Sequence, residues 1–150
     1  MLQKKPQTLA LKAPTSQNAL SLLAVHLTVG GKLITWKGKN RANSTQYANP
    51  WLQEAQTQKL WINPIDAQKR DIAQGDSVRI HNDRGVSCIP AEVTQRIMPG
   101  VVALQAGAWW QPDANGVDQA GCANVLSSAR ITALAKGNSH QTMLVEVAKA

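Results

Sequence analysis

The sequence predicts a mainly β domain with short helices, closed into a compact barrel. Between Trp61 and Trp110, short apolar and alternating segments follow one another with glycine-containing turns and almost no connecting sequence. A chain of 150 residues is one ordinary domain, large enough to bury a hydrophobic core. We therefore expect several short strands around one core, with a short helix among them.

The helix is expected to begin after Asn63. An asparagine can cap a helix, and Pro64 fits the first helical position. Ile65 and Ile72 lie seven residues apart, so they are expected to share the apolar face of a short amphipathic helix. Gly75 is expected to end this helix and to turn the chain into a strand.

The next segment predicts a half-buried strand that enters a hairpin. In residues 77–82, Val78 and Ile80 point to one side and polar side chains point to the other, which is the period of a strand. The sequence Asp83-Arg84-Gly85 is typical of a hairpin turn.

The strand returning from this hairpin, Val86–Val93, contains Pro90. Proline cannot donate a hydrogen bond to a ladder, so the sequence predicts an edge strand or a bulge here. Pro99-Gly100 marks a further turn, and Val101–Leu104 is predicted to be the strand that follows it.

The net charge of +7 is confined to the N-terminal part of the chain. Residues 1–60 contain eight Lys and Arg against one acid, whereas residues 61–150 contain eight against eight. Such a basic segment permits binding to nucleic acid or to an acidic membrane surface. The first eighteen residues, however, have the Lys, Gln, Pro, Thr and Ser composition of a flexible segment. We therefore divide the chain into a flexible leader, residues 1–18, and a barrel domain, residues 19–150.

Several classes of function find no support in the sequence. No segment approaches the roughly 20 apolar residues of a membrane-spanning helix. The apolar run Ala19–Val29 is not followed by a signal-peptidase-like site, so no export signal is predicted and the compartment stays open. Cys88 and Cys122 lack metal-ligand spacing and are expected to be free thiols. No nucleophile with an adjacent base is recognisable, so the chain is not expected to be catalytic alone.

Four longer motifs together resemble one family. They are WINPIDAQKRDIAQGDSVRIHNDRG, IPAEVTQRIMPGVVALQAGAWWQPDA, VDQAGCANVLSS and LAKGN, and the likeness runs from about Gln53 to Val147. They resemble the C-terminal domain of the dimethyl sulfoxide reductase family, whose members are bis-molybdopterin guanine dinucleotide oxidoreductases. The resemblance implies a double-psi β-barrel that closes over one end of molybdopterin guanine dinucleotide. It also implies that the molybdenum is carried by the cofactor and is not ligated by this chain.

A fifth segment of the family has the form Arg-x-His-Ser-Thr, and its counterpart here is Arg41-Ala42-Asn43-Ser44-Thr45. Asn43 stands in place of the histidine; its amide donates and accepts hydrogen bonds but lacks the shape and charge of an imidazole. Upstream, either Leu20–His26 or Leu33–Lys37 matches the first strand of the family. The spacing to Arg41 favours Leu33–Lys37.

Three further segments contain candidate ligand contacts. The small residues of Gln105-Ala106-Gly107 let the backbone pass close to a ligand or another domain, and one of Trp109 and Trp110 is expected to face inward. Asn124 either caps a helix or, as the resemblance implies, turns its amide to the cofactor. The run Lys136-Gly137-Asn138 is either a phosphate-binding turn or a solvated one. The predicted cofactor-binding residues are Arg41, Asn43, Ser44, Thr45, Gln105, Gly107, Asn124, Lys136, Gly137 and Asn138.

The leading hypothesis is a cofactor-binding domain of a molybdenum oxidoreductase that reduces S-oxides or N-oxides. Its partners would be the remaining domains of a molybdoenzyme catalytic subunit, in the same or another chain. A stand-alone double-psi barrel used for protein interaction is an alternative, because one fold serves many functions. A basic nucleic-acid-binding module is a third hypothesis, against which the balanced charge of residues 61–150 argues.

Overall fold

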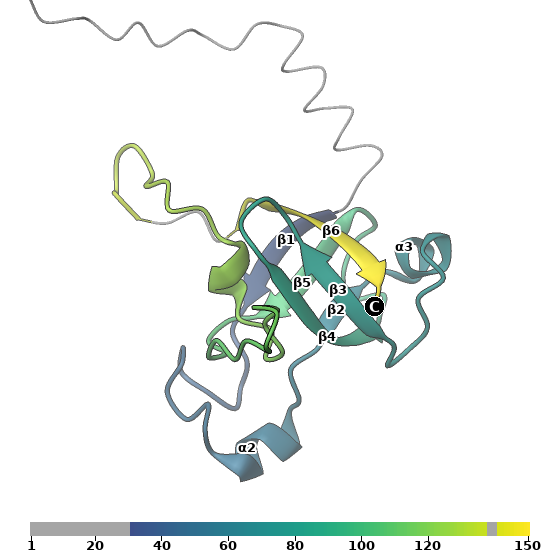
Figure 1. Ribbon diagram of the computed structural model, residues 1–150, viewed down its shortest axis with the longest axis horizontal. Coiled ribbons are helices and arrows are strands. Elements are labelled where there is room, and N and C mark those ends of the chain that lie inside the picture. Colours follow the sequence, from purple (N-terminus) through teal and green to yellow (C-terminus); the bar gives the residue numbers. More distant parts are fainter. Residues whose placement is uncertain (1–30, 138–140) are drawn as a thin grey trace, which may run out of the picture.

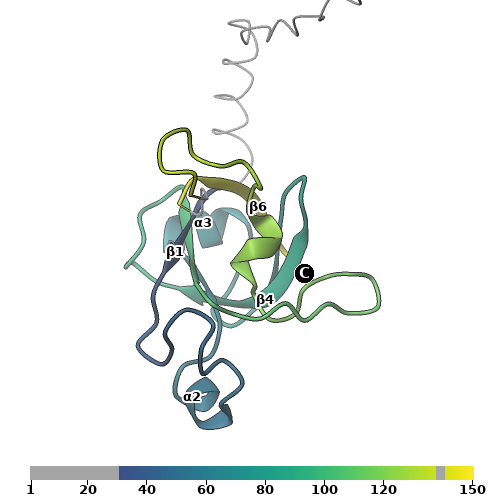
Figure 2. The same cartoon turned by 90° about the vertical axis from the view of Figure 1, so that its left-hand side faces the viewer.

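Six strands close into a barrel around one hydrophobic core (Figures 1 and 2). The computed structural model describes residues 31–137 and 141–150. The strands, in the order in which they pair around the barrel, are β1 (Gly31–Trp36), β5 (Val101–Gln105), β2 (Leu60–Ile62), β4 (Val86–Val93), β3 (Ser77–His81) and β6 (Met143–Lys149). The helices are α2 (Pro50–Ala55), α3 (Pro64–Lys69) and the 3-10 helix η1 (Ala123–Leu126). The prediction of a mainly β barrel with short helices is confirmed.

Two of the strand pairs are parallel, β1 with β5 and β2 with β4, and the other four are antiparallel. One side of every strand fills the barrel with aliphatic side chains. The largest fully enclosed strand residues are Leu33, Leu60, Ile62, Ile80 and Leu104, and Leu126 of η1 joins them. The first strand is β1, which agrees with the register Leu33–Lys37; Leu20–His26 and the leader at residues 1–18 lie outside the described residues.

The predicted hairpin of β3 and β4 is confirmed. Val78 and Ile80 are fully buried, whereas the alternate residues of β3 face outward. Asn82 holds the turn, because its Oδ1 accepts hydrogen bonds from the backbone N–H groups of Arg84 and Gly85.

The expectation that Pro90 marks an edge or a bulge was wrong, because β4 pairs on both sides within a closed barrel. One side of β4 pairs with β3 from Val86 to Pro90. On the other side, the N–H of Cys88 donates to Asp118, and pairing with β2 starts only at Ala91. Pro90 lies between these two partners, where the absence of an N–H group costs no ladder bond.

Helix α3 begins as predicted and ends earlier. Asn63 caps it by accepting a hydrogen bond from the N–H of Ile65, and Pro64 is its first residue. The helix ends at Lys69 and not near Gly75, because Asp71 adopts a positive φ of 53° and reverses the chain. The predicted apolar face was also wrong: Ile72 is buried after the helix, whereas Ile65 is 53% exposed.

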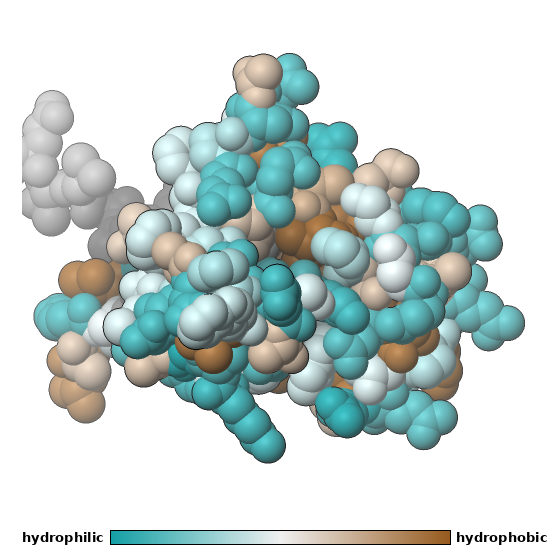
Figure 3. All heavy atoms as spheres, turned by 90° about the horizontal axis from the view of Figure 1, so that it is seen from below, coloured by the Kyte–Doolittle hydropathy of each residue, from teal (hydrophilic) through white to brown (hydrophobic). Residues whose placement is uncertain are grey.

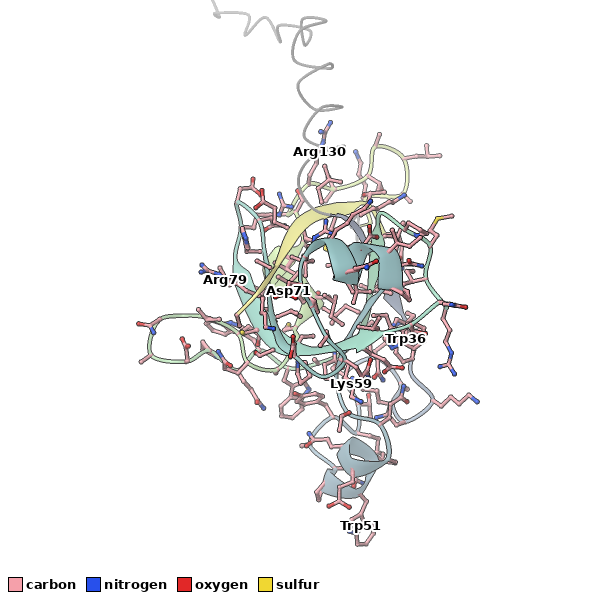
Figure 4. All side chains as sticks on the ribbon, turned by 90° about the vertical axis from the view of Figure 1, so that its right-hand side faces the viewer. Trp36, Trp51, Lys59, Asp71, Arg79 and Arg130 are labelled. Carbon is pink, nitrogen blue, oxygen red and sulfur yellow. The ribbon has the colours of Figure 1, made fainter. Side chains whose placement is uncertain are left out.

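Two long segments leave the barrel at the same end. Because β1 and β5 are parallel, with Trp36 opposite Gln105, the residues that follow each strand emerge side by side. Residues 37–59 form an excursion that carries α2 away from the barrel, with Trp51 at its outer end (Figures 1 and 4). Among the described residues, no helix has the length and apolar character needed to cross a membrane.

Candidate functional site

The 37–59 excursion and the segment that follows β5 contact each other immediately beyond the barrel. The N–H of Ala106 donates to the carbonyl of Trp36 at 2.9 Å, and the indole N–H of Trp109 donates to the carbonyl of Ser44 at 3.1 Å. A Cβ added to Gly107 would lie 1.7 Å from the Asn43 carbonyl oxygen, and Gly107 has a positive φ of 95°. Only glycine permits this approach. The 41–45 segment is therefore held against the segment that follows β5.

The contact between these segments lines a cavity of about 350 Å³, which we call the loop-end cavity. A neighbouring hollow of about 490 Å³ shares four of its lining residues and extends it toward Trp109 and Trp110. The residues that line the first cavity are Thr35, Lys37, Asn43, Ser44, Ala106, Gly107, Ala108, Cys122, Ala123, Asn124 and Gln141. Seen from the α2 side, the surface is mostly hydrophilic, with hydrophobic side chains scattered across it (Figure 3).

Four of the predicted site residues line the loop-end cavity: Asn43, Ser44, Gly107 and Asn124. Asn43 adopts a positive φ of 54°, which asparagine tolerates better than most residues. Its Oδ1 accepts a hydrogen bond from the ammonium group of Lys37. The cavity thus has a cation at its wall, in addition to amide and hydroxyl groups.

Asn124 does not cap a helix, so that interpretation was wrong. Cys122 precedes η1, and Asn124 is the second residue of that helix, with its side chain exposed toward the cavity it lines. The backbone carbonyl of Asn124 accepts hydrogen bonds from the backbone N–H and the hydroxyl of Ser127. The backbone is thus fixed while the amide stays available.

Arg41 and Gln105 lie in a different part of the loop end, which is the end of the barrel where the 37–59 excursion and the segment after β5 emerge. The amide nitrogen of Gln105, a residue only 1% exposed, donates to Asn40 Oδ1 at 2.7 Å. Gln58 donates to the carbonyls of Gln105 and Gly121 and accepts a hydrogen bond from Arg41. These side chains connect the base of the 37–59 excursion to the end of β5 and to the loop before η1.

The remaining predicted residues lie apart from the loop-end cavity. Thr45 is exposed, and its N–H closes a turn onto the carbonyl of Ala42. Lys136 and Gly137 are exposed in a turn in which Gly137 exchanges hydrogen bonds with Thr132. This loop starts near Arg130, at the opposite end of the molecule from Trp51 (Figure 4). Asn138 lies outside the described residues.

Asp118 organises the cavity wall, although the sequence reasoning missed it. Its carboxylate is completely buried and accepts hydrogen bonds from the hydroxyl of Ser87 and from the N–H groups of Gln111, Ala120 and Cys122. These bonds tie the loop between β5 and η1 to β4. The sequence contained a signal, an aspartate directly before the Gln-Ala-Gly-Cys run, but no rule of periodicity identifies such a residue as a buried acceptor.

The expectation that one of the two tryptophans faces inward was wrong. Trp109 is 51% exposed and Trp110 is 62% exposed. Trp109 lies 5.7 Å from Tyr47, centroid to centroid, and both side chains belong to the loop end. Burial raises the pKa of Tyr47 above its ordinary value, so its hydroxyl is a neutral donor near neutral pH.

The groups at the loop-end cavity fit a phosphorylated heterocycle. An ammonium group and a hydroxyl suit phosphate oxygens, and carboxamides donate and accept at once, as the edge of a pterin or guanine ring requires. Within the described residues, no cluster of three or more His, Cys, Asp or Glu is placed to hold a metal ion.

Comparisons with known proteins agree with this chemistry. The family described as "Molydopterin dinucleotide binding domain" matches residues 32–144. Dimethyl sulfoxide reductase DmsA of Escherichia coli (strain K12) is 56% identical over 111 residues, which cover 74% of this chain and 14% of that protein. The dimethyl sulfoxide/trimethylamine N-oxide reductase of Cereibacter sphaeroides is 41% identical over 93 residues, which cover 59% of this chain and 11% of that protein.

The fold has a counterpart in a solved structure. Acetylene hydratase from Pelobacter acetylenicus superposes with a TM-score of 0.69 at 12% sequence identity, over 91% of this chain and 20% of that one. At this identity the likeness concerns the fold alone, and together with the family match it confirms the predicted double-psi β-barrel. The dinucleotide form of molybdopterin is the ligand that the family description names, as predicted. This chain therefore belongs to the family of molybdopterin dinucleotide-binding domains.

Proposed function

We propose that the loop-end cavity binds part of molybdopterin guanine dinucleotide, as the cofactor-binding domain of a molybdenum S-oxide or N-oxide reductase. The observation that carries this proposal is the convergence of four candidate residues, from three separate segments of the chain, on one cavity beside Lys37. The relatives named as dimethyl sulfoxide and trimethylamine N-oxide reductases support the substrate class.

Each group at the cavity has a role that follows from its chemistry. Lys37 and the hydroxyl of Ser44 bind phosphate oxygens, because charge-assisted hydrogen bonds are strong and suit a diphosphate. The amides of Asn43 and Asn124 form hydrogen bonds with the edge of a pterin or guanine ring. A hydrogen bond to a charged group contributes about 1.5–3 kcal/mol net, so several such contacts are needed for tight binding.

Lys37 also explains how Asn43 serves in place of a histidine. The lysine ammonium group donates to Asn43 Oδ1, which leaves the NH₂ of this amide to face the cavity. The pair presents a cation and an amide donor together, whereas a neutral imidazole presents one donor. We propose that the pair makes the cofactor contact at this position.

Other domains complete the site. The chain spans about a seventh of the length of the dimethyl sulfoxide reductases that it matches, since it covers 14% of each of the first relatives. The cofactor supplies a redox-active molybdenum centre when it is bound, and we propose that this chain orients one end of the dinucleotide and shields it from water. Lys136, Gly137 and Asn138 stay candidates for a second phosphate contact, on a separate loop.

The test is a titration of the chain with molybdopterin guanine dinucleotide released from a denatured molybdoenzyme. Specific binding stabilises the folded state by mass action, so the thermal midpoint rises with cofactor concentration. Asn124→Ala and Lys37→Gln each remove one contact and are expected to weaken binding about 10-fold, which corresponds to roughly 1.4 kcal/mol.

The matched control is Asn115→Ala, an exposed asparagine whose side chain does not line the loop-end cavity. This variant is expected to bind the cofactor as the unaltered chain does. Equal binding by Asn124→Ala, Lys37→Gln and Asn115→Ala would contradict the proposed contacts.

A further inference from the structure

A smaller cavity lies on the other side of the 41–47 turn. Its volume is about 190 Å³, which equals roughly six water molecules at about 30 Å³ each. It shares no lining residue with the loop-end cavity. We call it the amide cavity, because carboxamides dominate its wall: Asn40, Gln46, Gln53, Gln56, Gln58, Gln111 and Gln119, together with Arg41 and Tyr47.

Arg41 is fixed at this cavity with part of its donor capacity unused. Its guanidinium carbon lies 5.1 Å from the centre of the Tyr47 ring, and its Nη2 donates to Gln58 Oε1. Its Nε is enclosed and has no hydrogen-bond partner. Within the described part of the chain, Nη1 has no partner either and is not enclosed. A cation held in place, with unused donor capacity, therefore lines the cavity.

The charge of Arg41 lacks a counterion in residues 31–137 and 141–150. The ion pairs of these residues involve Arg70, Arg84, Lys149 and His81, and none involves Arg41. Asp118 is not the counterion of Arg41, because its carboxylate already accepts hydrogen bonds from four donors. Burial lowers the pKa of Arg41, which reflects the cost of enclosing an unpaired cation.

The carboxamides around Arg41 suit an anion that is planar and accepts several hydrogen bonds. Three of the carboxamide NH₂ groups already donate to backbone or side-chain acceptors of the protein, those of Gln53, Gln58 and Gln119. Gln56 and Gln111, also at the wall, form no side-chain hydrogen bond within the part of the chain that is described. The cavity thus combines one cation with neutral donors and contains no acidic side chain among its lining residues.

We propose that the amide cavity is a carboxylate-binding site in which Arg41 is the anchoring residue, separate from the cofactor contacts of the loop-end cavity. A guanidinium group and a carboxylate are both planar, so they pair through parallel hydrogen bonds. The carboxylate comes either from a small free acid or from an aspartate or glutamate side chain of a neighbouring domain. This inference does not rest on the proposed function, because it uses a different cavity.

The test follows the Arg41 Nε–H resonance by NMR while the ¹⁵N-labelled chain is titrated with acetate, and with chloride at the same ionic strength. The proposal predicts a saturable shift with acetate and none of comparable size with chloride. A parallel titration compares N-acetylglutamate amide with N-acetylglutamine amide, which differ in the carboxylate alone. At least 10-fold tighter binding of the glutamate compound than of acetate identifies an acidic side chain as the source, and equal binding identifies a free acid.

Two variants keep the proposal falsifiable. Arg41→Gln is expected to lose at least 10-fold in acetate affinity. Arg96→Gln is the matched control, since Arg96 also lies over an aromatic ring, that of Trp61, away from the amide cavity. No saturable shift of Arg41 with any carboxylate overturns the proposal, even if Arg41→Gln fails to fold. Loss of cofactor binding in a folded Arg41→Gln chain overturns the separation of the two cavities.

Discussion

The barrel and the loop end are stabilised by different interactions. Sixteen buried apolar residues of the described part of the chain form the barrel core, which a wall of paired strands surrounds. At the loop end, the apolar cluster consists of Tyr47, Ala108 and Ala120. Hydrogen bonds between side chains and backbone hold the loops there in place. Apolar burial tolerates many sequences, whereas a hydrogen-bond network needs particular residues. The barrel therefore determines the fold, and we propose that the loop end determines the ligand.

The two regions are joined at few points, which makes them separable by mutation. Gly107 and Gln105 link the end of β5 to the 37–59 excursion, and Asp118 links the following loop to β4. A defect in the core is expected to lower the stability of the whole domain. A defect at one of these links is expected to loosen the loop end while the barrel persists.

The largest effect is expected from Leu104→Ala. Leu104 is fully buried and lies opposite Leu60 in the register of β5 and β2. Truncation leaves a cavity in the core, and we expect the free energy of unfolding to fall by about 2–5 kcal/mol. Urea unfolding monitored by circular dichroism measures this value. Leu144→Ala, at an exposed position of β6, is the control and is expected to change stability by less than about 0.5 kcal/mol.

A smaller and local effect is expected from Asp118→Asn. An amide at this buried position presents one acceptor oxygen and introduces NH₂ donors beside N–H groups that need an acceptor. We expect a loss of about 1.5–3 kcal/mol, concentrated in the loop between β5 and η1. Hydrogen exchange at the amides of Gln111 and Cys122 is expected to accelerate, with unchanged exchange in β1 and β5.

Asp113→Asn is the control for this prediction, because Asp113 accepts hydrogen bonds from neighbouring amides in an exposed turn. If Asp118→Asn accelerated exchange equally throughout the barrel, the two regions would not be separable.

The two thiols report on the two regions without destabilising either. Cys88 lies half-buried on the outer side of β4, whereas Cys122 is buried at the loop end, and both are free. Burial raises the pKa of the Cys122 thiol, which further slows its reaction with a thiol reagent near neutral pH. We expect one faster and one slower phase, with Cys88→Ser removing the faster one. Asp118→Asn is expected to accelerate the slower phase alone; acceleration of both phases would point to global opening.

The smallest effect is a pH dependence at the barrel surface. The hydrogen bond from Lys149 lowers the pKa of Asp76, and the same pair raises the pKa of Lys149. The contribution of Asp76 is therefore present above its unfolded pKa of about 3.9 and is lost as the pH falls through the lower folded value. That of Lys149 is lost as the pH rises through its raised pKa, above about 10.4.

Thermal midpoints between pH 2 and pH 6 measure how the stability falls with pH on the acid side. Asp76→Asn is expected to make this fall, the acid limb of the pH profile, less steep. Asp76 does not line the loop-end cavity, so cofactor affinity in Asp76→Asn should equal that of the unaltered chain. An unchanged acid limb in this variant would show that other carboxylates account for it.

Local rules predicted much of the barrel. The alternation in β3, the Asn63 cap and the turn before β5 depend on neighbouring residues, so the sequence contains their signals. The failures came from tertiary context. Pro90 is compatible with a paired strand because β4 changes its pairing partner at this residue. Ile65 is exposed because α3 contacts the barrel through Asp66 and Ala67 instead.

The site was less predictable for a related reason. Lys37 contacts Asn43, six residues further along the same excursion, and Asp118 contacts β4 and the backbone of its own loop; hydrophobic periodicity identifies neither contact. The resemblance indicated three segments that line the loop-end cavity. It did not indicate that the Gln105 side chain bonds to Asn40 or that Arg41 faces a separate cavity. Whether a side chain in a motif faces a ligand or a neighbour depends on the loop that packs against it.

Hydrogen exchange of the chain with and without molybdopterin guanine dinucleotide tests the central claim most directly. If the loop end binds the cofactor and the barrel only presents it, protection is expected in residues 37–45, 106–110 and 122–126. The amides of β3, β4 and the C-terminal half of β6 should exchange as before. Protection confined to the barrel surface around β3 and β6, with none in residues 37–45 and 122–126, would contradict the account.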